Sequence, residues 1–189
     1  YTESGRIFIS AQNVNPFKYK PEIHRYVSEE AYLNYIKGRT PEYGDVLVAR
    51  VGAGIGEAAV INKHLNFAFY VSLGLIKPIK DALNSYFLEI LFNSIYGVTY
   101  SKGNIASSGT SAGNFNLEKI RKFPIPLPPL AEQQAIVEAV KQAMEKLGQL
   151  RDELTHQRTQ AGELLKALLH RAFQVEEVED LDVATSVEA

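Results

Sequence analysis

The side chains best suited to chemistry gather in two polar stretches. The first, around residues 11–16, offers amide groups and nearby cations: Gln12, Asn13, Asn15, Arg6, Lys18 and Lys20. The second, residues 101–114, offers a cation, an amide and hydroxyls: Lys102, Asn104, Ser107, Ser108, Thr110 and Ser111. These groups form hydrogen bonds and ion pairs and include no obvious nucleophile–base arrangement, so the chemistry they indicate is binding.

The sequence lacks the motifs of common catalytic and cofactor sites. It has no P-loop, no GxSxG and no HExxH, and its histidines show no metal-ligand spacing. The run Gly52-Ala-Gly-Ile-Gly56 lacks the GxGxxG spacing and leads into a predicted strand, which argues against dinucleotide binding. The absence of cysteine excludes disulfides and thiolate chemistry. We therefore predict a non-catalytic chain without its own metal or cofactor.

The net charge of −2 hides an uneven distribution. Residues 1–128 carry +4, residues 129–174 are neutral, and residues 175–189 carry −6. A mildly basic domain is compatible with a nucleic-acid partner and equally with an ordinary protein surface. No secretory signal and no apolar run near the ~20 residues of a membrane span are visible, so we expect a cytoplasmic protein.

The elements that must position these side chains indicate an α+β fold. Strands are predicted at residues 6–10, 45–50, 57–62 and 67–76. Helices are predicted after Ser28, from Ser85 to Tyr96 with a stop at Gly97, and after Asn116, while residues 101–114 should form an exposed loop. Because the chain starts close to a strand, we expect further N-terminal strands to precede it.

A proline-free segment from Leu130 to Phe173 predicts one long helix. Its apolar residues recur at spacings of three and four: Val137, Val140, Met144, Leu147, Leu150, Leu154, Ala161, Leu165, Leu168 and Ala172. This narrow stripe approaches the 3.5-residue repeat of a coiled coil, so the helix needs a partner helix. A hairpin folded near Gly148 is the alternative.

Four stretches carry a resemblance to a known family. They are residues 7–14, residues 44–56, residues 109–117 leading into Ile125-Pro-Leu-Pro-Pro-Leu-Ala-Glu-Gln-Gln134, and residues 164–173. The Pro-rich run that ends in a helix is the most specific of the four. Together they resemble one half-repeat of the DNA-specificity subunits of type I restriction-modification systems, which usually hold two recognition domains and two helices.

The resemblance implies three regions. Residues 1–127 would be a target-recognition domain that reads about half of a bipartite duplex DNA target. Residues 128–173 would be a spacer helix that pairs antiparallel with a second copy, or with the second half of a longer subunit. Residues 174–189 would be an acidic, disordered tail. Modification subunits would methylate adenine with S-adenosylmethionine, and restriction subunits would translocate and cut DNA with ATP and Mg²⁺.

The resemblance also implies roles for the polar residues. Amides of the first stretch could pair with adenine edges while its cations hold phosphates, and the second stretch could approach DNA closely. Arg50 could reach a phosphate or a guanine, or could form a structural ion pair. Glu132, Gln133 and Gln134 could dock a modification subunit, or Glu132 could serve the electrostatics of the helix start.

Two other functions remain open from the sequence. One is a coiled-coil adaptor whose domain binds protein. The other is a recognition domain of a fused restriction–methylation enzyme.

Overall fold

The computed structural model describes residues 1–105 and 113–174 of the chain. It forms two units, residues 1–138 and residues from 139 onward. We call residues 1–138 the globular unit. No helix among the described residues is long and apolar enough to cross a membrane.

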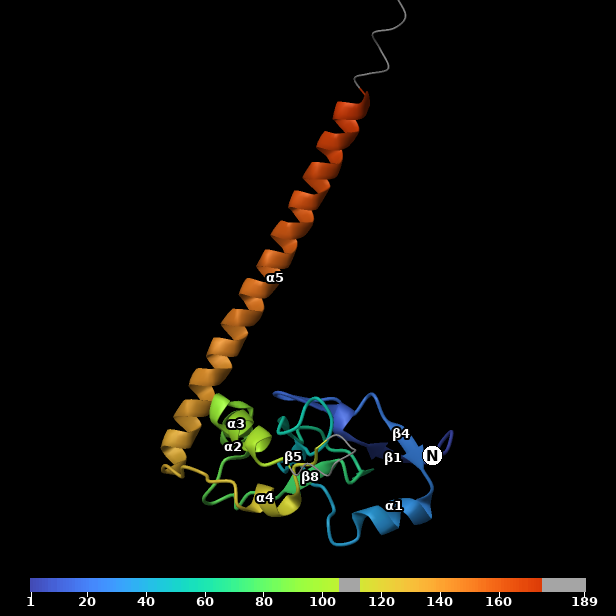
Figure 1. Ribbon diagram of the computed structural model, residues 1–189, viewed down its shortest axis with the longest axis vertical. Helices are drawn as coiled ribbons and strands as arrows, with labels where there is room; N and C mark the ends of the chain where they lie inside the picture. Colours follow the sequence, from blue (N-terminus) through green and yellow to red (C-terminus); the bar gives the residue numbers. More distant parts are fainter. Residues whose placement is uncertain (106–112, 175–189) are drawn as a thin grey trace, which may run out of the picture. The chain divides into compact units, whose positions relative to one another are not determined.

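Two small sheets and a hairpin form the β structure of the globular unit (Figure 1). The first sheet has the order β4-β1-β7, in which β1 pairs antiparallel with β4 and parallel with β7. The second has the order β6-β5-β8 and is antiparallel throughout. The strands are β1 (Arg6–Ile9), β2 (Val14–Asn15), β3 (Lys18–Tyr19), β4 (Arg25–Val27), β5 (Val46–Ala49), β6 (Ala58–Val60), β7 (Phe67–Phe69) and β8 (Leu73–Ile76). Strands β2 and β3 form the hairpin, and a short 3-10 turn, η1 (Ala11–Asn13), precedes it.

The single strand predicted over residues 67–76 is wrong, because a turn divides it. The Leu73 N–H donates to the Tyr70 carbonyl at 3.0 Å, and β7 and β8 then join different sheets. An apolar, β-branched run does not show by itself where a tight turn redirects the chain.

Helix starts follow the expected capping chemistry. Ser28, Asn84 and Asn116 each accept a backbone N–H at the start of a helix. The helices of the globular unit are α1 (Glu29–Ile36), α2 (Ser85–Asn93), α3 (Ile95–Gly103) and α4 (Leu117–Arg121).

The helix predicted to run from Ser85 to Tyr96 ends earlier, at Asn93. Ser94 has an extended backbone and caps α3, because its Oγ accepts the Gly97 N–H at 3.2 Å. Gly97 therefore lies inside α3 and is not a stop signal. The predicted exposed loop is also wrong at its start, because Ser101, Lys102 and Gly103 belong to α3.

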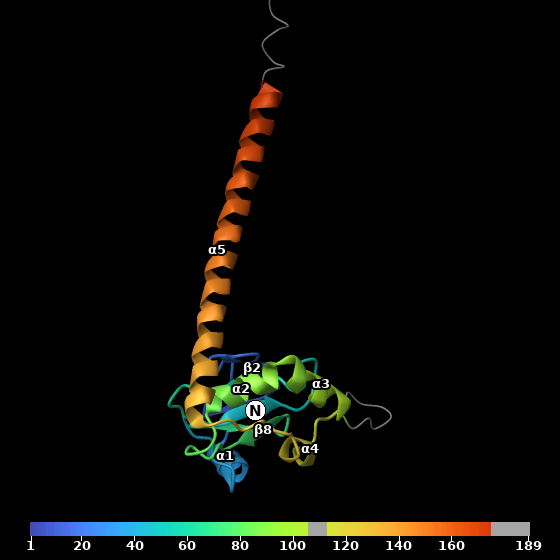
Figure 2. The same cartoon turned by 90° about the vertical axis from the view of Figure 1, so that its left-hand side faces the viewer.

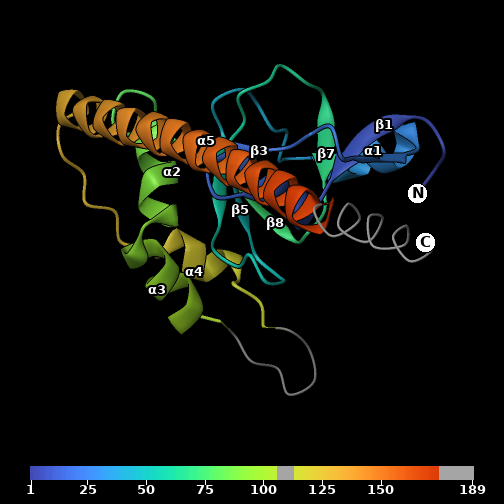
Figure 3. The ribbon, with the colours of Figure 1, turned by 90° about the horizontal axis from the view of Figure 1, so that it is seen from above.

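The core is layered, and β5 lies at its centre. Leu47 packs in one apolar cluster with residues of the first sheet such as Phe67, while Val46 and Val48 pack in another with α2 residues such as Leu88. A third cluster lies between α1 and the first sheet. Figure 3 shows this order, from α1 and β1 through β5 and β8 to α2 and α4. Strand β5 is buried on both faces, which explains its unbroken apolar sequence.

The long helix is confirmed as α5 (Leu130–Gln174), which is 45 residues long and has no break at Gly148 (Figure 2). At 1.5 Å per residue it extends about 65 Å. Its first residues belong to the globular unit, which reaches Glu138. Farther along, the leucines of the stripe are exposed, with Leu147 61% and Leu154 66% accessible.

Candidate nucleic-acid interface

A glycine-rich turn after β5, residues 51–57, meets several of the polar segments that the sequence singled out. Gly52 and Gly56 have φ of +87° and +88°, a backbone region that residues with a Cβ rarely adopt. A Cβ on Gly56 would lie 2.5 Å from the Ser101 side chain, so α3 packs directly against the turn. Gly52 has open space around it and is exposed.

The first polar stretch meets this turn on another side. Gln12 and Gly52 line the same hollow of about 340 Å³, together with Arg25 and Tyr70. The Ala11 N–H donates to the Ser72 Oγ at 3.1 Å, which holds the stretch against the turn between β7 and β8. Gln12 is exposed, so its amide is available to a ligand. Arg25 and Tyr70 were not predicted, since only tertiary folding brings them beside Gln12.

The β2–β3 hairpin lies next to the end of the glycine-rich turn. The Phe17 N–H donates to the Ala58 carbonyl at 3.3 Å. Lys18 is exposed, while Asn15 and Lys20 are half-buried. The turn thus packs against α3, lines a hollow together with the first stretch and leads into β6, which the hairpin contacts.

Asn13 corrects the predicted set of base-contacting amides. Its side chain is fully buried, and its Oδ1 accepts the Ser10 N–H at 2.8 Å. Its Nδ2 donates to the carbonyls of Lys20 (2.8 Å) and Ile23. Both ends of the amide are occupied, so Asn13 links loop segments and has no free group for a base.

Arg6 already has an anionic partner. Its guanidinium forms a two-point contact with the Glu29 carboxylate, at 2.6 Å from Nε and 3.0 Å from Nη2. The hydrogen bond and charge of Glu29 raise the pKa of Arg6, and Arg6 in turn lowers the pKa of Glu29. Arg6 would have to release this carboxylate before it could hold a phosphate.

Arg50 joins three segments. Its Nε donates to the Phe115 carbonyl at 3.1 Å and its Nη1 to the Val71 carbonyl at 2.7 Å. Its backbone N–H donates to the Ser72 carbonyl at 2.8 Å. The alternative of a structural ion pair is wrong, because no carboxylate in the described part of the chain pairs with Arg50. Arg50 is instead a clamp on the loops, held by backbone carbonyls.

The second polar stretch is described only in part. Lys102 is exposed on α3, and Asn104 ends that helix with its Nδ2 donating to the Tyr100 carbonyl at 2.9 Å. Ser107, Ser108, Thr110 and Ser111 lie outside the described residues. Of the two predicted site residues that the structure describes in this stretch, Lys102 is the exposed one.

Gln133 binds its own chain, which overturns its predicted role in partner docking. The side chain is fully buried in the joint between the Pro-rich run and α2. Its Oε1 accepts the Asn84 N–H at 2.8 Å, and its Nε2 donates to the carbonyls of Ala82 (2.9 Å) and Pro128 (2.8 Å). Gln134 is exposed and accepts from the Asn84 side chain at 2.9 Å. Glu132 stays exposed.

The sequence model of the type I restriction modification DNA specificity domain matches residues 2–161. The chain belongs to this family. This chain is also similar to the type I restriction enzyme EcoBI specificity subunit of Escherichia coli. The two are 25% identical over 152 residues, which is 80% of this chain and 31% of that subunit.

Two solved structures share the fold of this specificity-domain chain. One comes from a study of complex assembly and conformational transition in the type I R-M system; its TM-score is 0.64 at 20% identity, and the match covers 92% of this chain and 40% of that one. The other is the HsdS subunit from Thermoanaerobacter tengcongensis, with a TM-score of 0.64 at 19% identity over 85% of this chain and 40% of that one. The chain therefore spans less than half the length of these relatives.

Proposed function

We propose that this chain is the sequence-reading part of a type I restriction-modification complex and recognises one half of a bipartite DNA target. The observation that supports it best is the glycine-rich turn, which packs against α3, shares a hollow with the Gln12 stretch and leads into β6 beside the β2–β3 hairpin. These segments carry the exposed polar groups Gln12, Lys18 and Lys102. Amides suit base edges and lysines suit phosphates, so the segments around the turn offer both kinds of contact.

The proposal assigns chemistry to partner subunits. Modification subunits would supply adenine methylation with S-adenosylmethionine, and a restriction subunit would use ATP and Mg²⁺. The described residues contain no group of three or more His, Asp or Glu side chains placed to hold a metal ion. We expect this chain to act in the cytoplasm without catalysing either reaction, and to pair through α5 with a second such helix.

The first experiment is a map of methylated adenines in host DNA with and without the gene. We expect deletion to remove one gapped methylation motif, and a palindromic motif would mean that two identical copies pair. Restoring the gene with Gln12→Ala should alter or relax one half-site of the methylated motif. The expected loss is about 1–3 kcal/mol of discrimination between bases at the affected position. Asn34→Ala, an exposed amide on α1, is the matched control and should restore the original motif.

An unchanged set of motifs in an active system, with no duplex binding by the purified chain, would refute DNA reading. It would favour the adaptor function, in which the exposed apolar stripe of α5 would bind a partner helix.

A further inference from the structure

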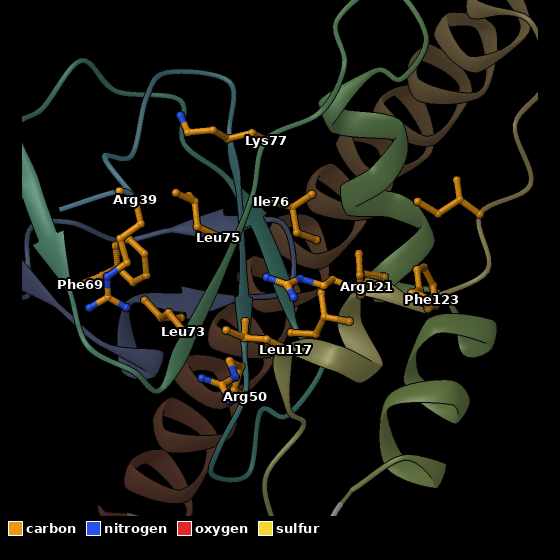
Figure 4. A pocket seen from close by; sticks show the side chains of 14 residues that line it. Arg39, Arg50, Phe69, Leu73, Leu75, Ile76, Lys77, Leu117, Arg121 and Phe123 are labelled. Atoms are coloured by element: carbon orange, nitrogen blue, oxygen red, sulfur yellow. The ribbon is translucent and has the colours of Figure 1, made fainter. Parts of the chain in front are cut away.

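A second hollow, separate from the one beside Gln12, has a cationic rim. It has a volume of about 530 Å³ and lies among β8, the end of α1, α4 and the segment after α4. Its walls are largely aliphatic, with Leu73, Leu75, Ile76, Leu117 and Ile125 among them (Figure 4). Four cationic side chains also line it: Arg39, Arg50, Lys77 and Arg121. We call this hollow the arginine pocket.

The cations of the arginine pocket differ in whether they already form an ion pair with a carboxylate. Lys77 lies 2.8 Å from the Asp45 carboxylate and 3.3 Å from that of Glu42. Within the part of the chain that the structure describes, no ion pair reaches Arg39, Arg50 or Arg121. Three guanidinium charges therefore share one hollow without a counter-charge of their own.

Two of the three guanidiniums are held in fixed positions. Arg39 donates from Nε to the Tyr35 carbonyl at 2.7 Å and lies over the Phe69 ring at 4.8 Å. Arg50 is held by its two carbonyl contacts, which engage only Nε and Nη1. Figure 4 shows Arg39 and Arg50 on either side of Leu73, with the Arg121 guanidinium directed toward the middle of the pocket.

This arrangement is unfavourable when empty. Burial, and then the charge of Arg39, lower the pKa of Arg50. The aliphatic walls of the pocket also focus the field of the like charges. An anion bound in the pocket would offset the repulsion, and guanidinium forks match the oxygens of a phosphate.

We infer that the arginine pocket holds a phosphate of the DNA backbone, with Arg39, Arg50 and Arg121 as its ligands. The inference rests on the proposed function and extends it, because none of these contacts reads a base. Arg50 connects the pocket to the base-reading surface, since the same side chain clamps the Val71 and Phe115 segments. A phosphate held here would fix the register of the duplex against Gln12.

The test compares two charge-matched variants of the full chain. Arg39→Gln with Arg121→Gln removes two ligands. Lys63→Gln with Lys80→Gln removes two cations that line neither the arginine pocket nor the hollow beside Gln12. Duplex affinity is measured by fluorescence anisotropy from 50 to 300 mM salt. Each lost phosphate contact makes the plot of log affinity against log salt shallower, by about 0.9 in slope. Because the pocket holds one phosphate, we expect the slope of the pocket variant to be shallower by about 0.9. We also expect its affinity to fall at least about 10-fold, equally for target and scrambled duplexes.

The outcomes separate the two proposals. A wild-type slope in the pocket variant would overturn the arginine pocket and leave DNA reading intact. A loss confined to the target duplex would also overturn it, because the pocket would then read bases. A wild-type chain that binds no duplex would overturn both. Arg121→Gln alone, at an exposed position without an ion pair among the described residues, gives the same readout if the double variant unfolds.

Discussion

At the residue scale, three buried polar side chains of the globular unit, Asn13, Glu89 and Gln133, hold backbone segments together. Asn13 and Gln133 are fully buried, and every hydrogen bond they form goes to a backbone group. Glu89 on α2 follows the same rule, since its carboxyl accepts the Val60 N–H at 2.8 Å. A buried amide can satisfy both kinds of backbone group without charge, whereas a buried carboxyl changes its charge with pH.

Glu89 gives the globular unit a pH-dependent stability. Burial raises the pKa of its carboxyl from 4.5 to about 7. The folded state thus retains a proton that the unfolded state loses. The contribution of Glu89 to stability is therefore fully present below pH 4.5 and is lost as the pH rises through about 7. The loss approaches about 3 kcal/mol. Urea unfolding from pH 4.5 to 8 should show this fall, and Glu89→Gln should remove it.

The control is Glu118→Gln. Its carboxyl is exposed beside Lys122, which lowers its pKa, so it titrates below this window. The control should keep the wild-type fall, and an equal fall in the Glu89→Gln protein would assign the pH dependence to another group.

At the element scale, hydrogen bonds to the start of α2 fix the junction between the Pro-rich run and α5. Proline fixes the run in an extended form, and the helix begins at Leu130 where no further proline interrupts it. The first turn is then anchored because Gln133 reaches the start of α2, which Asn84 caps. The most specific stretch of the family resemblance therefore contains a residue with an internal structural task.

Gln133→Ala should destabilise the globular unit by about 2–3 kcal/mol in urea unfolding. The substitution leaves the Asn84 N–H and the carbonyls of Ala82 and Pro128 without their buried partner. Gln134→Ala is the control and should cost less than about 0.5 kcal/mol, because its contact is exposed. Wild-type stability in Gln133→Ala, combined with lost capture of a modification subunit, would restore the docking role.

At the scale of the whole molecule, the apolar stripe of α5 from residue 139 onward is exposed to solvent. Leu150, Leu165 and Leu168 are 57%, 57% and 55% exposed. Fully burying a leucine contributes about 1.5–3 kcal/mol, so several such residues in one seam can hold two chains together. An unbroken helix with such a stripe suits the antiparallel pairing that we propose.

Leu147→Asp with Leu154→Asp should weaken self-association at least about 100-fold, since two charges would enter an apolar seam. Sedimentation equilibrium measures this, and the wild-type association should change little with salt because it is apolar. Gln149→Asp, exposed on the same helix outside the stripe, should associate like the wild type. A wild type that stays monomeric at high concentration would argue against pairing between copies.

The sequence by itself determined the local features: the capped helices, the buried strand β5, the long helix with its stripe and the stretches that mark the family. Such features depend on neighbours within a few positions, so periodicity and capping residues reveal them.

Only the tertiary structure decided which polar side chains are free. Asn13 and Gln133 were predicted to face ligands, but carbonyls and N–H groups of other segments occupy them. Carbonyls of other segments also hold Nε and Nη1 of Arg50. The Phe115 partner of Arg50 is 65 positions away. The arginine pocket is likewise a tertiary product, because Arg39, Arg50 and Arg121 come from three separate segments. Burial and pairing across such separations depend on how the layers pack, and residue types alone do not encode that.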